Sequence, residues 1–220
     1  MSGPMRVKIC GLRSRAEVGA AVDAGASYVG FVFFPPSPRH LTIADARWVI
    51  PSVPEGLVRV ALTVDATDET LEALLAAVPV DMLQLHGQET PERVAEVRQR
   101  FARPVMKAVG IAGEADLPAL VAYSSVADQI LVDARPPRDA SIPGGNGIAF
   151  DWGLIRGRRW KRPWMLAGGL TPANVAEAVR LTGAEQVDVS SGVESRPGYK
   201  DAGLVADFVR SAREAERLEA

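Results

Sequence analysis

The sequence predicts an α/β fold, a single (β/α)₈ TIM barrel, and three observations support this prediction. Eight short runs rich in Val, Ile and Leu alternate with amphipathic stretches. Strands that are separated by helices need crossover connections, and these produce a parallel sheet. The length of 220 residues suits a barrel of eight such units, whereas an open doubly wound sheet commonly has five or six strands. We therefore expect one barrel domain spanning residues 1–220.

The strands are predicted in chain order, each followed by helix signals. They lie near residues 6–10, 28–33, 58–64, 81–86, 104–109, 128–133, 163–167 and 186–190. Helix starts and ends are indicated at Ser14 with Glu17 (a capping box), at Thr90 and Thr171 (each before a proline), and at Gly25 and Gly183. A last buried helix is expected after Asp201 from the spacing of its apolar residues. The fifth and sixth helices are weakly indicated, because Pro118 interrupts one and a Pro/Gly-rich insertion at 134–150 precedes the other.

Composition and charge restrict the classes of partner. The net charge is −2 with few aromatic residues, and no basic stripe is present, so we expect a small-molecule ligand and neither nucleic acid nor a membrane surface. One cysteine cannot form an internal disulfide, no apolar run approaches the roughly 18 residues of a membrane span, and residues 1–5 are too short for a signal peptide. These features predict a cytoplasmic protein.

The alternation of side chains along each strand predicts which of them enter the barrel. Val7 and Ile9 are apolar and should face the helices, which leaves Lys8 and Cys10 inside. The same rule places Gln84, His86, Asp188 and Ser190 inside. Closing the barrel makes the first and eighth strands neighbours, so we predict an ion pair between Lys8 and Asp188, since a buried charge needs a partner. The alternative is that both contact only bound water.

Two residues at strand ends are candidates for proton transfer. Cys10 and Asp133 each end a predicted strand, at the C-terminal mouth where barrel enzymes hold their active sites. A thiolate accepts a proton when a nearby cation favours ionisation, and Lys8 is the candidate cation. The structural alternatives are a small buried hydrophobe for Cys10 and a helix cap or loop hydrogen bond for Asp133.

Three glycine segments predict a phosphate site. The pair Gly168-Gly169 follows the seventh strand and Ser191-Gly192 follows the eighth, the two loops that form phosphate sites in many barrels. Glycine lets backbone N–H groups approach an oxyanion closely. The segment Gly145-Asn146-Gly147 lies in the insertion after the sixth strand and is expected to close over the same phosphate. A single glycine pair would be only a turn.

Taken together, these segments resemble the phosphoribosylanthranilate isomerase family. The resemblance covers nearly the whole chain, through VKICGL, GFVFFPPSPRH, LQLHG, LVDA, GGNGIAFDW, LAGGLTPANV and VDVSSGVESRPGYKD. It implies a barrel of the ribulose-phosphate-binding type that performs an Amadori rearrangement of N-(5-phosphoribosyl)anthranilate, without metal or organic cofactor. In the family, the cysteine matching Cys10 is the general base, the aspartate matching Asp133 is the general acid, and the arginine matching Arg39 lies near the anthranilate end. His86 is left as a substrate contact or a packed histidine.

Alternatives to this function remain open at the level of sequence. Asn146 stands where the family commonly has threonine or serine, and Arg-Pro-Pro follows the aspartate segment. A sister barrel of histidine biosynthesis isomerises an aminoimidazole ribotide, but it resembles a two-half duplication with an aspartate ending the first strand, where this chain has Cys10. A catalytically silent phosphate-binding barrel is the other alternative. Both a monomer and a homodimer are compatible with the sequence.

Overall fold

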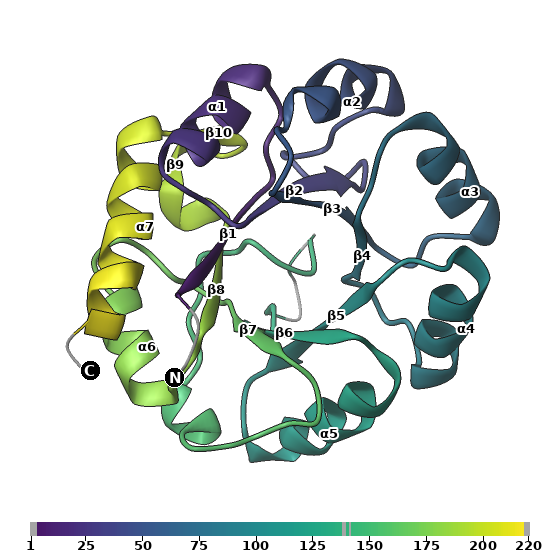
Figure 1. Ribbon diagram of the computed structural model, residues 1–220. Coiled ribbons are helices and arrows are strands. Elements are labelled where there is room, and N and C mark those ends of the chain that lie inside the picture. The colour runs from purple at the N-terminus through teal and green to yellow at the C-terminus, as the bar shows by residue number, and fades with distance from the viewer. Residues whose placement is uncertain (1–3, 138–139, 141, 218–220) are drawn as a thin grey trace.

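Eight parallel strands close into a barrel in the computed structural model, which describes residues 4–137, 140 and 142–217. Each strand pairs with the next in chain order, and β8 pairs with β1 (Figure 1). The strands are β1 Arg6–Cys10, β2 Tyr28–Phe33, β3 Val58–Thr63, β4 Met82–Leu85, β5 Val105–Ile111, β6 Gln129–Ala134, β7 Trp164–Leu166 and β8 Gln186–Val189. The predicted fold class is confirmed.

Helices form an outer ring around these strands (Figure 1). They are α1 Arg15–Asp23, α2 Ile43–Val49, α3 Asp68–Ala77, α4 Pro91–Phe101, α5 Leu117–Val126, α6 Val175–Thr182 and α7 Ala202–Arg217, with 3₁₀ turns η1 Ile50–Ser52, η2 Glu114–Asp116, η3 Trp152–Ile155 and η4 Ser191–Val193. The short η3 takes the place of an α-helix between β6 and β7. It follows the Pro/Gly-rich insertion, where the helix signal in the sequence is weak.

The helix ends confirm some sequence predictions and correct others. Thr90 caps α4 as predicted. The prediction that Pro118 interrupts its helix is wrong, because Pro118 lies in the first turn of α5, where a missing N–H costs nothing. Thr171 is not the cap of α6 either; a turn intervenes, and the Asn174 side chain accepts from the Thr171 N–H before the helix begins.

The capping box at Ser14 is only half formed. The Ser14 hydroxyl accepts a hydrogen bond from Glu17 N at 3.2 Å, as predicted. The Glu17 carboxylate, however, accepts from the backbone N–H groups of Arg13 and Lys200. Glu17 thereby ties the start of α1 to the segment that precedes α7. The glycines at 25 and 183 both adopt the predicted left-handed conformation.

Side chains of the barrel strands separate into an outer core and an interior. Outward residues such as Val7, Ile9 and Leu83 are fully buried against the helices. The lower interior is filled by Tyr28, Val60, Met82, Met106, Ala108, Leu131, Met165 and Ala167. The top interior layer is small and consists of Cys10, Val32 and Leu62. The parity rule is therefore confirmed, and it places the thiol at the open end of a packed core.

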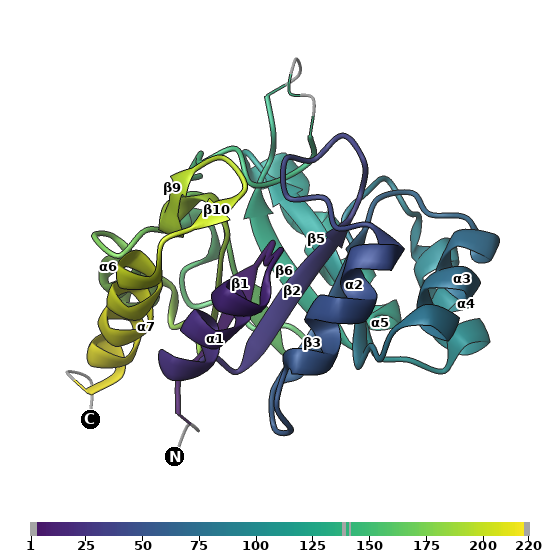
Figure 2. The same cartoon turned by 90° about the horizontal axis from the view of Figure 1, so that it is seen from above.

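The loops at the C-terminal ends of the strands gather at one end of the barrel (Figure 2). A two-stranded hairpin, β9 Glu194–Arg196 and β10 Tyr199–Lys200, lies at this end between β8 and α7. Both chain ends lie at the opposite end (Figure 2).

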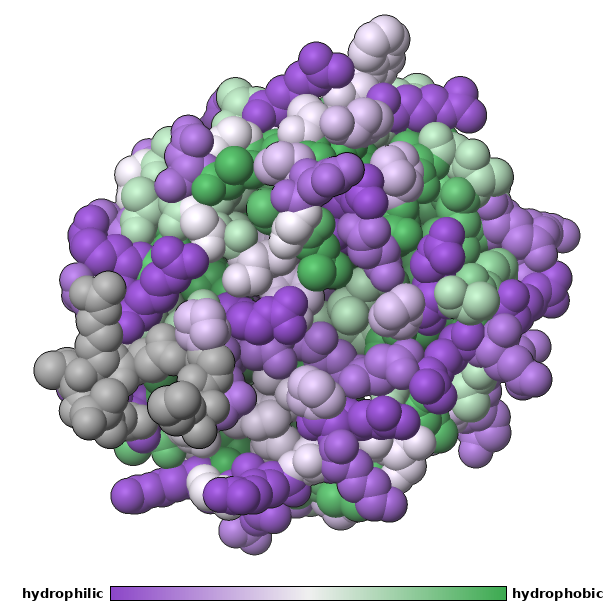
Figure 3. Space-filling model, viewed as in Figure 1, coloured by the Kyte–Doolittle hydropathy of each residue, from purple (hydrophilic) through white to green (hydrophobic). Residues whose placement is uncertain are grey.

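Hydrophilic side chains lie between the hydrophobic ones on the face of the molecule that Figure 3 shows. Among the described helices, none has the length and apolar character that crossing a membrane requires.

Candidate active site

Cys10 ends β1 directly above the predicted ion pair. The Lys8 ammonium lies 2.8 Å from a carboxylate oxygen of Asp188, across the β1–β8 register that pairs these two residues. The prediction of this pair is confirmed. Gly30 on β2 leaves room for the thiol, because a Cβ at this position would lie 2.9 Å from the Cys10 sulfur. Gly30 has no charge or polar group to mark it, so sequence reasoning missed it.

The groups around the Cys10 thiol have opposite effects on its pKa. Burial raises the pKa of Cys10 above its ordinary value, and the nearby Asp188 carboxylate acts in the same direction. Lys8, through its charge and a hydrogen bond, and Lys200, through its charge, counteract part of this effect. The thiol therefore ionises with more difficulty than a free cysteine, although the cations limit the penalty.

Asp133 is the penultimate residue of β6, and both of its carboxylate oxygens have a neighbouring nitrogen. One oxygen accepts from the backbone N–H of Ala134 at 2.8 Å, which is a local hydrogen bond of the kind that the structural alternative proposed. The other lies 3.3 Å from His86 Nε2, so His86 is a neighbour of the carboxylate. His86 Nδ1 lies 3.0 Å from the amide nitrogen of Gln84. Gln84, which faces inward from β4, thus contacts His86, and His86 in turn contacts Asp133.

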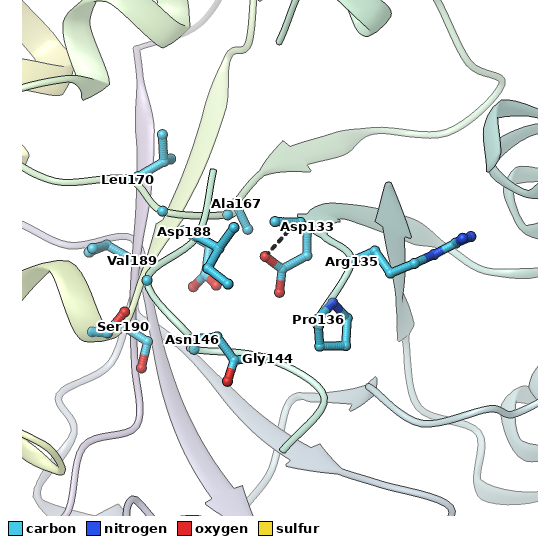
Figure 4. Close-up of a pocket in the computed structure, with 17 residues that line it drawn as sticks. Asp133, Arg135, Pro136, Gly144, Asn146, Ala167, Leu170, Asp188, Val189 and Ser190 are labelled. Carbon is cyan, nitrogen blue, oxygen red and sulfur yellow. Dashed lines mark hydrogen bonds between the residues drawn. The ribbon is translucent and has the colours of Figure 1, made fainter. Parts of the chain in front are cut away.

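Two adjoining pockets open at this end of the barrel. One is lined by Cys10, Val32, Phe34, Leu62 and Val64 together with Arg39, His86 and Asp133. The other is lined by Asp133 and by the glycine loops after β6, β7 and β8. Figure 4 shows the Asp133 carboxylate in this second pocket and the Arg135 side chain directed away from it. Asp133 and Asp188 line both pockets, so Cys10 and Asp133 face one continuous space.

The glycine loops form the second pocket because side chains are sterically excluded from them. A Cβ on Gly168 would lie 2.6 Å from Ala134 N, and one on Gly192 would lie 1.9 Å from the Leu170 carbonyl oxygen. Gly168 and Gly169 also have positive φ, which other residues rarely adopt. Within the described residues, no protein acceptor takes the N–H groups of Gly168, Gly169 and Gly192. These donors suit an oxyanion.

The segment after β6 covers both pockets. Gly144 lies against His86 and Asp133, Gly145 lies beside Arg39, and both line the two pockets. Gly147 approaches the Ser191 hydroxyl, 3.8 Å from where its Cβ would be. The Asn146 side-chain amide donates to the Ile142 carbonyl of its own loop, and Asn146 lines the second pocket.

Arg39 is buried at the C-terminal end of the barrel, and its guanidinium is paired with the carboxylate of Glu194. Its Nε and Nη2 donate to the two oxygens of Glu194 at 2.7 and 2.9 Å, and Nη2 also lies 3.3 Å from the Gly145 carbonyl oxygen. Glu194 in turn accepts from Lys200 at 2.7 Å. Neither Glu194 nor Lys200 was singled out from the sequence. The only signal in the sequence was that both residues are charged and lie within the VESRPGYKD segment.

A second buried pair supports the loop that carries His86. The Lys107 ammonium donates to the carbonyls of Leu85 and Gly87 and to Glu89 at 2.8 Å, on the helix side of the barrel. Glu89 also accepts from the backbone of Asp65 and Gly87. Sequence reasoning missed the Lys107–Glu89 pair, although a lysine at an outward strand position was a usable signal. The described residues contain no cluster of His, Cys, Asp and Glu that would hold a metal ion.

Comparison with protein families identifies a match over almost the whole chain. The model of the N-(5'-phosphoribosyl)anthranilate (PRA) isomerase family matches residues 7–211. An N-(5'-phosphoribosyl)anthranilate isomerase of Cereibacter sphaeroides is 64% identical over 209 residues, which cover 95% of this chain and 99% of that protein. The isomerase of Paracoccus denitrificans is 59% identical over 206 residues, covering 94% of this chain and 96% of the relative.

Solved structures give the same result. The phosphoribosyl anthranilate isomerase of Thermotoga maritima superposes with a TM-score of 0.86 at 35% identity, covering 96% of this chain and 99% of that one. A phosphoribosyl anthranilate isomerase in complex with reduced 1-(o-carboxyphenylamino)-1-deoxyribulose 5-phosphate superposes with a TM-score of 0.82, at 35% identity and with the same coverage.

Proposed function

Because the chain belongs to the N-(5'-phosphoribosyl)anthranilate isomerase family, we propose that Cys10 and Asp133 carry out the isomerisation that the family performs. The enzyme converts N-(5-phosphoribosyl)anthranilate to 1-(2-carboxyphenylamino)-1-deoxyribulose 5-phosphate in tryptophan biosynthesis. The single observation that supports the assignment of residues is that the thiol and the carboxyl group line one pocket. Family membership favours this activity over an aminoimidazole-ribotide isomerase and over a silent phosphate-binding barrel.

The reaction needs a proton donor and a proton acceptor at different atoms of one sugar. As general acid, the Asp133 carboxyl donates its proton to the furanose ring oxygen, the C1′–O bond breaks, and the nitrogen lone pair forms the protonated imine of the open-chain sugar. The Cys10 thiolate then removes the proton on C2′, and the electron pair moves to give an enolamine. Tautomerisation of the enolamine yields the ketone. Lys8 favours the thiolate, while Asp188 keeps Lys8 charged in the buried interior.

The phosphate is held by backbone N–H groups at the far side of the space. The donors come from Gly168 and Gly169 after β7 and from Ser191 and Gly192 after β8. Gly145, Asn146 and Gly147 cover this pocket from the loop after β6. An anchored phosphate fixes the sugar between Asp133 and Cys10, and this restraint is a large part of catalysis when two groups must act in sequence.

The aryl end of the substrate occupies the apolar pocket. Val32, Phe34 and Leu62 provide surface for a ring, and Arg39 at the rim provides planar donors for the ring carboxylate. His86 contacts Asp133 and lies at the same pocket, so we place it as a support for the acid and a contact of the substrate.

Two substitutions test the assignment of the acid and the base. We expect Cys10→Ser and Asp133→Asn each to reduce kcat at least about 100-fold, the lower range for a general acid or base. Turnover is followed by the loss of substrate fluorescence, and folding by circular dichroism. Asp207→Asn, at an exposed position on α7, is the matched control and should keep full turnover. Near-normal kcat in Cys10→Ser or Asp133→Asn would refute that residue's role.

The phosphate site is tested separately. Gly169 has φ +62°, and a Cβ there would lie 2.5 Å from Ala149 N. We expect Gly169→Leu to displace the covering segment and to raise KM for the phosphorylated substrate. An unchanged KM together with unchanged inhibition by inorganic phosphate would contradict the placement of the phosphate.

A further inference from the structure

Three charged side chains form a buried cluster at the rim of the apolar pocket, separate from the Lys8–Asp188 pair. Arg39 and Glu194 are joined through two hydrogen bonds, and Lys200 joins the same carboxylate at 2.7 Å. Only 6%, 4% and 1% of the Arg39, Glu194 and Lys200 side chains are exposed, respectively. We call these three residues the rim cluster.

The rim cluster contains two basic side chains and one carboxylate. Burial disfavours the ionised form of Glu194, but the hydrogen bonds and charges of Arg39 and Lys200 outweigh burial and lower its pKa below the usual range. Glu194 is therefore ionised and lies between two basic side chains, while burial lowers the pKa of Lys200 itself. An anion bound at this rim would balance the excess of basic groups in so buried a place.

The geometry of Arg39 leaves one edge for that anion. Glu194 takes Nε and Nη2, the side of the guanidinium that faces β9. Nη1 makes no hydrogen bond within the described residues and lies nearest the covering Gly145, at the wall of the pocket that also holds Cys10. A carboxylate that enters this pocket meets Nη1 without displacing Glu194.

The rim cluster is also connected to the strand of the proposed base. Lys200 donates to the Ser190 carbonyl and hydroxyl oxygens at 3.0 and 3.2 Å. The Ser190 hydroxyl donates to the Cys10 carbonyl oxygen at 3.0 Å. One chain of hydrogen bonds thus runs from Arg39 to the backbone of Cys10.

We propose that Glu194 and Lys200 are positioning residues for the recognition of the substrate carboxylate, with Glu194 fixing Arg39 by one edge and Lys200 fixing Glu194. This inference rests on the proposed function, because it takes Arg39 as the group that binds the carboxylate. Glu194 acts as an internal carboxylate that orients the arginine, and Lys200 restores the positive charge that Glu194 removes. Glu194 acts through Arg39, and Lys200 acts through Glu194 and also, by its charge, on the Cys10 thiol; neither side chain donates or accepts the protons that are transferred.

The test combines Glu194→Gln with two substrates, the phosphoribosyl derivatives of anthranilate and of aniline, which differ only in the ring carboxylate. In the wild-type protein the carboxylate should lower KM at least about 10-fold, which corresponds to one charge-assisted hydrogen bond. In Glu194→Gln, KM for the anthranilate compound should rise about 10-fold while kcat stays within about 3-fold. KM for the aniline compound should change less than about 2-fold, because no group of that compound meets Arg39.

A matched control and a second variant keep the result decisive. Glu96→Gln makes the same chemical change in an exposed ion pair on α4, and it should leave both KM values unaltered. Lys200→Gln should show the same selective rise in KM as Glu194→Gln, together with a lower kcat for both substrates because its charge also favours the Cys10 thiolate; its KM ratio for the two substrates replaces that of Glu194→Gln if that variant does not fold.

Each other outcome overturns a distinct claim. An equal loss for both substrates, or a lower KM for the anthranilate compound in Glu194→Gln, overturns the positioning role alone. A wild-type protein that treats both substrates alike overturns the assignment of Arg39 to the carboxylate, and the positioning role with it.

Discussion

Replacing Asp188 with asparagine should destabilise the protein in a strongly pH-dependent way. Lys8 has no exposed surface, so in Asp188→Asn water cannot replace the lost partner. A buried lysine without a counter-charge gives up its proton. For a lysine with an ordinary pKa of about 10.4 in the unfolded chain, that loss costs up to about 4.6 kcal/mol at pH 7, at about 1.36 kcal/mol per pH unit. This agrees with the about 3–5 kcal/mol found when one partner of a buried pair is removed.

The sign of the pH dependence separates the variant from the parent protein. In the wild-type protein burial lowers the pKa of Lys8, but the charges and hydrogen bonds of Asp188 and Cys10 outweigh burial and raise it, so the stability that Lys8 contributes is fully present below pH of about 10.4 and is lost only as pH rises through the folded value. In the variant the unfolded chain binds one more proton than the folded chain. The penalty therefore shrinks as pH rises, by about 1.36 kcal/mol per unit.

The measurement is urea unfolding followed by tryptophan fluorescence at several pH values between pH of about 7 and 9.5. Both proteins carry Cys10→Ser, which removes the titration of the thiol from the comparison. Asp207→Asn, which breaks an exposed pair with Arg210, is the control and should cost no more than about 1 kcal/mol. A penalty for Asp188→Asn that equals the control, or that does not change with pH, would refute the reasoning.

Three further predictions concern the space around the thiol and the phosphate loops. Gly30→Ala should reduce kcat sharply and lower stability by about 1–3 kcal/mol, the usual cost of overpacking, because its Cβ would lie 2.9 Å from the Cys10 sulfur and 3.1 Å from the Cys10 Cα; kinetics and urea unfolding check this. Gly192→Ala should lose both stability and phosphate affinity, because its Cβ would lie 1.9 Å from the rigid Leu170 carbonyl; phosphate inhibition measures the second effect. Alkylation of Cys10 by iodoacetamide should still accelerate with pH above about 8.5, the pKa of a free thiol, because burial raises its pKa. A rate that levels off below that pH would contradict it.

The parts of the fold and site that follow from local rules could be predicted from the sequence. Period-two alternation fixed the inward direction of Lys8 and Asp188, and closure of the barrel made them neighbours. Their ion pair was therefore predictable without coordinates. The rule that a threonine before a proline caps a helix fails at Thr171. The Asn174 side chain accepts a hydrogen bond from the Thr171 N–H, and the helix begins only after Asn174.

The residues that were missed depend on contacts between distant segments. Arg39 and Glu194 are 155 positions apart, and no pattern in either segment shows that the two side chains meet. Gly30 is required only because Cys10 lies on the neighbouring strand. Lys107 departs from the parity rule, since an outward strand position carries a charge, and its partner Glu89 lies in a loop. Such residues need the three-dimensional arrangement before their role can be recognised.

The Lys8–Asp188 pair balances stability against activation of the thiol. A lone Lys8 would lower the pKa of Cys10 more effectively, because the Asp188 carboxylate raises it again. A lone Lys8 in a site without exposed surface would, however, lose its proton and with it the charge that favours the thiolate. Asp188 therefore keeps the cation charged but cancels part of its effect on sulfur. Lys200 acts on the thiol in the same direction as Lys8; burial lowers the pKa of Lys200, and Glu194 at 2.7 Å counteracts part of that effect. Two cations that are each paired with a carboxylate thus offset part of the penalty that burial places on the thiolate.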